Sequence, residues 1–157
     1  SGMEEDLTWS ISMMLFCPSC EHWLFTLGDY QSGIYEYMNI EELYDYCLSI
    51  PGAEVTTPFD DVTLVMKVCD KMFALIPLDA DRLSVALKCE PEKAVRLREE
   101  YRCVEPAFHM NKTYWNTIYI TGEMPDEELK IWIRHSVEEV IKKLPKIKQK
   151  EYYGSVE

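Results

Sequence analysis

The residues best suited to chemistry lie together in one short stretch of the chain. Eight positions hold His109, Asn111, Lys112, Trp115 and Asn116. Lysine and asparagine contact phosphates and base edges, a tryptophan ring stacks on a base, and histidine can act as a general base. The same residue types also suit a core ring and hydrogen bonds to loop backbone. We favour the structural role for Trp115 and His109, and leave both roles open for Asn111 and Lys112.

A second stretch combines two thiols with an imidazole. Cys17 and Cys20 form a C-x-x-C, and His22 follows two residues later. This spacing is typical of a redox pair or of half a zinc site, but zinc needs four ligands and no second pair follows at a suitable distance. We therefore expect reduced thiols, no metal site and no cofactor. Cys47, Cys69 and Cys89 fall in apolar segments, where a thiol acts as a small hydrophobe.

Motifs for other chemistry are absent from the sequence. It has no phosphate-binding glycine loop, no dinucleotide fingerprint and no H-E-x-x-H. Asp60–Asp61 and Glu99–Glu100 are adjacent carboxylates, which diverge on a strand or helix and indicate solvated surface. His135 falls in the middle of an expected helix, at the surface or the edge of the core. No nucleophile pairs visibly with His109, so we expect no catalytic residues and no enzyme.

Composition and charge narrow the class of protein. The 157 residues are 47% hydrophobic, and the formal net charge is −12. The hydrophobic fraction excludes a wholly disordered chain and predicts a globular protein. The sequence has no stretch of about 18 uncharged apolar residues, so we expect no membrane span, and the expected reduced thiols predict a cytoplasmic protein. An acidic protein repels nucleic acid at long range, but the bases gather in 88–112 and 142–150. We interpret both groups first as solvated faces and second as binding footprints.

Residues 1–37 differ in character from the rest. They hold six acids and no Lys or Arg, and 9–27 is rich in Trp, Phe, Leu and Met. Ser1–Gly2 resembles the remnant of a cleaved tag, and Met38 is a plausible start of the main domain. An ordered apolar segment must bury its side chains, so we expect 9–27 to pack against its own domain or a second chain.

Helix and strand signals follow from Met38 onward. Asn39 and Glu42 form a capping box, and Pro91 and Pro125 open later helices. Apolar residues alternate at 62–69 and 82–89, 72–77 returns after a tight turn, and 115–121 is rich in aromatic and β-branched residues. We predict helices near 39–49, 91–101 and 125–144, and strands at 62–69, 72–77, 82–89 and 115–121. Residues 102–114 are expected to be irregular. The domain 38–147 is then followed by a polar tail, 148–157. The order α-β-β-β-α-β(β)-α predicts a two-layer α+β fold, an antiparallel sheet of about four or five strands with helices on one face.

Several motifs resemble those of the MmcQ/YjbR family. They are SIPG at 49–52, KMFAL at 71–75, KCEPEKA at 88–94, HMNKTYWNT at 109–117, PDEEL at 125–129 and KLPK at 143–146. The resemblance covers roughly 38–147. The chain departs from the family pattern at 104–108, where the family has Pro-Gly and an aromatic residue, and in its first 37 residues.

The resemblance implies a CyaY-like fold, also likened to secretion chaperones, and a "double wing" that binds DNA. Together with the basic and aromatic residues of this chain, the resemblance favours one hypothesis: a weak or non-specific DNA-binding module. Its contact residues would be Lys88, Asn111, Lys112, Trp115 and Asn116. The alternative is a protein-interaction or chaperone-like adaptor with no nucleic-acid binding and no catalysis. The net negative charge of the chain and its apolar segment 9–27 favour this alternative, with a protein partner or self-association.

Overall fold

The structure is a computed structural model that describes residues 14–17, 22–26, 37–57 and 62–155. Contacts divide the chain into two units, Ser1–Tyr37 and Met38–Glu157. In the first unit, β1 (Met14–Cys17) pairs antiparallel with β2 (His22–Thr26). The predicted burial of the side chains in 9–27 lies outside the described residues.

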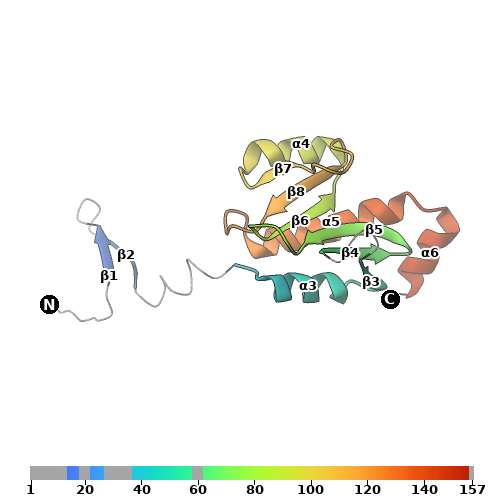
Figure 1. The fold of residues 1–157 in the computed structure, drawn as a ribbon, viewed down its shortest axis with the longest axis horizontal. Coiled ribbons are helices and arrows are strands. Elements are labelled where there is room, and N and C mark those ends of the chain that lie inside the picture. Colours follow the sequence, from blue (N-terminus) through green and yellow to red (C-terminus); the bar gives the residue numbers. More distant parts are fainter. Residues whose placement is uncertain (1–13, 18–21, 27–36, 58–61, 156–157) are drawn as a thin grey trace. The chain divides into compact units, whose positions relative to one another are not determined.

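The second unit is built on a six-stranded antiparallel sheet (Figure 1). Its spatial order is β3-β4-β5-β6-β8-β7. The strands are β3 (Ala53–Thr56), β4 (Thr63–Val68), β5 (Lys71–Pro77), β6 (Ser84–Lys88), β7 (Val104–Pro106) and β8 (Trp115–Tyr119). The four predicted strands are confirmed as β4, β5, β6 and β8.

Two edge strands were missed in the sequence. The segment between α3 and β4, for which the sequence predicts no strand, contains β3, and the segment 102–114, expected to be irregular, contains β7. Both are short and pair on one side only, β3 with β4 and β7 with β8. Pro106 lacks an N–H donor, which an edge strand tolerates and a central strand does not. Strands this short show too little alternation to be predicted.

The three predicted helices are confirmed with bounds that differ by one or two residues. They are α3 (Ile40–Ser49), α4 (Pro91–Glu100) and α5 (Asp126–Lys142). The capping box is present: Asn39 Oδ1 accepts from the Glu42 amide at 2.8 Å, and Glu42 Oε1 accepts from the Asn39 amide at 3.0 Å. No helix among the described residues is long and apolar enough to cross a membrane.

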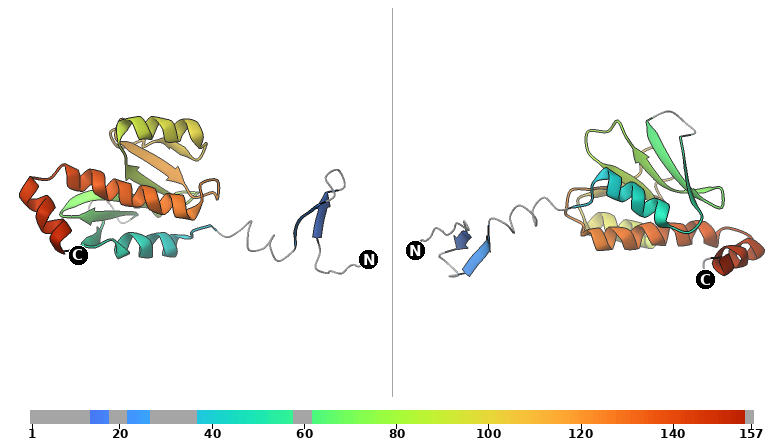
Figure 2. Two further views of the ribbon diagram at one scale, coloured as in Figure 1. Left: turned by 180° about the vertical axis from the view of Figure 1, so that it is seen from behind. Right: turned by 90° about the horizontal axis from the view of Figure 1, so that it is seen from below.

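The helices and one face of the sheet enclose the core. Figure 2 shows α4 and α5 together on one side of the strands. Fully buried side chains from α3, α5 and the strands meet there, among them Leu43, Met66, Ile76, Val85, Ile133 and Ile141. The predicted α+β fold, an antiparallel sheet covered by helices, is therefore confirmed.

One buried hydroxyl fastens α5 to two strands. Ser136 Oγ donates to the Phe73 carbonyl at 2.6 Å and accepts from the Lys88 amide at 2.9 Å. Ser136 has no exposed surface. Because each partner is a backbone group, the serine fixes the height of α5 against β5 and the end of β6.

The polar segment 148–157, expected to be a tail, is mostly helical. It belongs to α6 (Lys146–Ser155), which begins directly after Pro145. Tyr152 holds α6 in place, because its hydroxyl donates to the Pro51 carbonyl at 2.9 Å and its ring packs against the core. With so few apolar side chains the segment lacks the stripe that predicts a helix.

Candidate functional site

The face of the sheet away from the core carries a row of small and medium side chains. Leu75 on β5 pairs with Ala86 on β6, which pairs with Thr117 on β8. Directly paired residues in a ladder project to the same face, and their chain neighbours project to the other. The row one residue away, Ala74, Leu87 and Asn116, therefore faces the helices.

A hollow of about 620 Å³ lies over this row. Its floor comes from the central strands, and one wall comes from the loop after β7. The lining residues are Thr63, Leu75, Pro77, Ala80, Ser84, Ala86, Ala107, Phe108, His109, Met110, Thr117 and Tyr119. Three alanines and a serine leave room that larger side chains would fill. The mixture of apolar walls with a few hydroxyls and one imidazole is typical of a ligand pocket.

Two aromatic rings of the hollow each lie under a cation. The Arg82 guanidinium carbon is 4.1 Å from the centre of the Tyr119 ring. Lys112 Nζ is 5.6 Å from the centre of the Phe108 ring. Phe108 is 76% exposed, and His109 packs edge-on against it with ring centres 4.7 Å apart. Positive charge thus reaches the walls of an otherwise apolar hollow.

Asn116 and Trp115, two residues of the expected nucleic-acid site, are buried. Asn116 is 1% exposed, and its amide accepts from Arg98 Nε at 2.7 Å and donates to the Ala94 carbonyl at 3.1 Å. It thereby joins β8 to α4. Trp115 is also buried, at 7% exposed, which agrees with a structural role, but it projects to the face opposite Asn116 and lies outside the helix-covered core. In this conformation neither side chain is presented to a nucleic acid.

Asn111 and Lys112 shape the loop before β8. Asn111 Oδ1 accepts from the Thr113 amide at 2.9 Å, and its carbonyl accepts from the Trp115 amide at 2.9 Å. The Lys112 carbonyl accepts from Arg98 Nη2 at 2.6 Å, while its ammonium extends over Phe108. Asn111 is thus committed to the turn, and Lys112 presents its charge beside the hollow.

Lys88 belongs to a different electrostatic environment. Burial lowers the pKa of its ammonium, and the positive charges of Lys143 and Lys71 lower it further, whereas Glu139 opposes them. We call Lys71, Lys88 and Lys143 the lysine group. Lys143 Nζ also lies 5.9 Å from the centre of the half-exposed Tyr114 ring. The five expected site residues therefore do not form one surface: only Lys112 adjoins the hollow, and Lys88 belongs to the lysine group.

Most residues of the hollow carry no signal in the sequence. Ser84 and Ala86 alternate as small residues on one strand, which is a signal that a strand face is open. That signal alone does not show which strands lie beside it. The contribution of the loop 107–110 depends on tertiary folding, so no local pattern predicts it.

Comparisons with known proteins place these features in a family. The YjbR family model matches residues 48–138. YjbR of Escherichia coli (strain K12) is 36% identical over 113 residues, 72% of this chain and 96% of that protein.

Two solved structures are similar in fold and sequence. A Deinococcus radiodurans structure with a domain described as DUF419 has a TM-score of 0.68 and 36% identity, and covers 73% of this chain and 88% of its own. A Pseudomonas syringae protein has a TM-score of 0.59 and 25% identity, with coverage of 66% and 99%. The likeness extends over most of the second unit, and the chain belongs to the YjbR family.

Proposed function

We propose that this domain is a non-catalytic protein-interaction module. In this proposal the hollow holds an apolar side chain from an acidic segment of a partner protein. The observation that carries the proposal is the pair of cations, Arg82 and Lys112, each positioned over an aromatic ring that lines an apolar hollow.

The size and chemistry of the hollow support an apolar occupant. Its volume of about 620 Å³ falls in the range of ligand pockets. Phe108 leaves 76% of its surface exposed at the wall, although burying a large aromatic side chain is worth several times the thermal energy. A partner side chain in the hollow would cover this ring and displace water from apolar surface.

The cations supply the preference for an acidic partner. Among the described residues, neither Arg82 nor Lys112 forms an ion pair. Their attraction to the rings keeps both charged groups close to the walls. Carboxylates that flank an apolar side chain would pair with them, whereas a basic segment would be repelled. Such contacts favour specificity and association rate.

Fluorescence polarisation with two labelled peptides tests this proposal. One peptide alternates aspartates with phenylalanine and leucine, and its matched partner has lysines in place of the aspartates. We expect saturable binding of the acidic peptide only. Ala86→Leu fills the floor of the hollow and should weaken that binding at least tenfold, and Phe108→Ala should also weaken it.

The matched control is Ile147→Ala, which removes an exposed apolar side chain from α6. It should leave the affinity unchanged. Equal binding of both peptides, or an acidic-peptide affinity that Ala86→Leu does not alter, contradicts the proposal.

The lysine group favours a second candidate function, weak DNA binding without sequence preference. Burial lowers the pKa of Lys88 first, and the positive charges of Lys143 and Lys71 lower it further, so three ammonium groups lie near one another. Such a group attracts phosphates. Tyr114, 37% exposed and adjacent to Lys143, offers a ring for stacking on a base. Binding to random duplex DNA at two salt concentrations tests this function. An absence of binding at low salt, where attraction is strongest, excludes it.

A further inference from the structure

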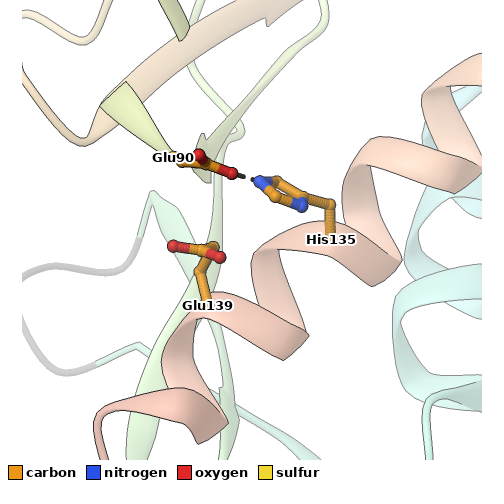
Figure 3. Close-up of side chains that lie close together, drawn as sticks. All are labelled: Glu90, His135 and Glu139. Atoms are coloured by element: carbon orange, nitrogen blue, oxygen red, sulfur yellow. Dashed lines mark hydrogen bonds between the residues drawn. The ribbon is translucent and has the colours of Figure 1, made fainter. Parts of the chain in front are cut away.

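Three side chains with metal-binding atoms converge where α4 and α5 approach each other (Figure 3). They are Glu90, His135 and Glu139, and one ligand atom from each lies within 4.8 Å of the other two. Figure 3 shows His135 and Glu139 projecting from α5 toward Glu90. This cluster lies on the helix-covered side of the sheet and shares no residue with the hollow.

The backbone fixes the positions from which these side chains project. His135 and Glu139 are four residues apart on α5, a spacing that places both on one face of a helix. Glu90 precedes α4 and follows directly after β6. The bond from the Lys88 amide to Ser136 Oγ ties the end of β6 to α5, so Glu90 is held beside the other two residues.

Glu139 is the unusual member of the cluster. It is 8% exposed, and it is the one charged side chain among the described residues that is buried. The negative charge of Glu139 is compensated by a single ion pair, in which its Oε2 lies 2.8 Å from Lys142 Nζ. Glu90 similarly pairs with Lys93 at 3.4 Å. The ammonium-bearing side chains of Lys142 and Lys93 are 60% and 41% exposed, so either can turn into solvent and leave its carboxylate to another cation.

We propose that Glu90, His135 and Glu139 bind a divalent transition-metal ion such as Zn²⁺. Two carboxylates and one imidazole are a ligand set that such ions accept, and three protein ligands leave a fourth position open to water. Metal–ligand bonds of about 2.1 Å require the ligand atoms to approach to roughly 3.4 Å. Side-chain rotations supply that approach, since His135 and Glu139 share a helix face.

Metal binding replaces one hydrogen bond of the His135 imidazole. His135 Nε2 accepts a hydrogen bond from the Glu90 amide at 3.2 Å, and this nitrogen would bind the ion in its place. The amide is then free to bond to water, because Glu90 is half-buried.

Isothermal titration of the 157-residue chain with Zn²⁺ tests the proposal. Cys17→Ser and Cys20→Ser are introduced first, so that the C-x-x-C thiols cannot bind the ion. We expect one ion per chain, and an affinity at least tenfold lower in His135→Gln and in Glu139→Gln. Glu138→Gln is the matched control, since it removes a neighbouring exposed carboxylate from the same helix and should retain the affinity.

Thermal unfolding provides a second measurement. A ligand that binds only the folded state raises the melting temperature. Zn²⁺ should therefore raise it in the Cys17→Ser, Cys20→Ser protein and in Glu138→Gln, and not in Glu139→Gln, whose near-isosteric amide keeps the fold. If Zn²⁺ does not bind, or if all variants bind it equally, the site does not exist. Because the hollow is separate, neither outcome affects peptide binding.

Discussion

The two faces of the central strands differ sharply although they alternate along the same backbone. The row that faces the helices is Ala74, Leu87 and Asn116, and the row that faces the hollow is Leu75, Ala86 and Thr117. In the first row Leu87 is 2% exposed and Asn116 is 1% exposed, with both hydrogen-bonding groups of Asn116 satisfied. All three residues of the second row keep partial exposure.

This difference separates stability from binding within single strands. The helix-facing row contributes to a closed core, in which every deletion leaves a cavity or an unpaired polar group. The other row forms the floor of a hollow, and none of the described helices lines it. Neighbouring residues such as Ala86 and Leu87 therefore respond to different constraints, and paired substitutions on the two faces test the distinction.

Truncating one leucine on each face should give the largest contrast. Leu87→Ala removes a core side chain, and core Leu→Ala changes lower the free energy of unfolding by about 2–5 kcal/mol. Leu75→Ala acts on a half-buried residue that borders the hollow. We expect it to lower the free energy by less than half as much. Urea denaturation of both variants measures the difference, and equal losses would show that the hollow is as closed as the core.

A polar pair gives the next largest effect. Asn116→Ala leaves the Ala94 carbonyl and Arg98 Nε without their buried partner, and we expect a loss of about 1–3 kcal/mol. Thr117→Ala on the opposite face should cost less than about 1 kcal/mol. Chemical denaturation measures both values. If Asn116→Ala instead leaves stability unchanged and weakens DNA binding, Asn116 is a binding residue and its buried contacts contribute little.

The strength of local signals explains which elements the sequence predicts. A capping box at Asn39 and Glu42 and prolines at helix starts predict the helices. Alternation predicts β4 and β6, a tight turn followed by an apolar run predicts β5, and aromatic and β-branched residues predict β8. The strand β7 and helix α6 depend on contacts with distant residues. Tyr152, for example, reaches Pro51, a separation of 101 positions that no local pattern reveals.

The same reasoning explains the limits of the expected site. The polar and aromatic residues at 109–116 were grouped because they are close in sequence, but strand alternation sends Trp115 and Asn116 to opposite faces. The hollow needs the register that sets Ala86 between Leu75 and Thr117. The cluster at Glu90 and Glu139 needs the packing of α5, so neither site has a compact sequence motif.

Burial in the helix-covered core should also make the free energy of unfolding depend on pH in alkaline solution. Burial raises the pKa of the Cys47 thiol to about 12, from an ordinary value near 9. The folded state therefore keeps its proton where the unfolded state has lost it. The stability that this thiol contributes is full below pH 9 and falls as the pH rises toward 12, by at most about 1.4 kcal/mol per pH unit.

Cys47→Ala removes this titration. Its free energy of unfolding should be lower at neutral pH, because the smaller side chain leaves a cavity, but should decline less steeply between pH 9 and 12. Urea denaturation at several pH values in that range gives both slopes. Cys69→Ala is the control, since that thiol is exposed and free in the β4–β5 turn. Parallel slopes for Cys47→Ala and the unaltered chain would show that the thiol ionises as readily folded as unfolded.

The smallest expected effects are on binding, where single lysine substitutions distinguish the hollow from the lysine group. Lys112 adjoins the hollow and Lys88 interacts with Lys143 and Lys71, so one lysine serves each candidate function. Lys88→Ala should weaken binding to random duplex DNA and reduce the dependence of log affinity on log salt by about one unit, because one phosphate contact is lost. It should leave the affinity for the acidic peptide unchanged.

Lys112→Ala should give the opposite result in the same two assays. It removes the charge over the Phe108 ring, so the acidic peptide should bind a few-fold more weakly, as expected for one exposed charge pair. Its DNA salt dependence should not change, because in this proposal Lys88 and not Lys112 contacts phosphate. A reduced salt slope in Lys112→Ala with no change in Lys88→Ala would move the DNA contact to the loop before β8. The hollow and the nucleic-acid surface would then share a residue, and peptide and DNA should compete for the protein.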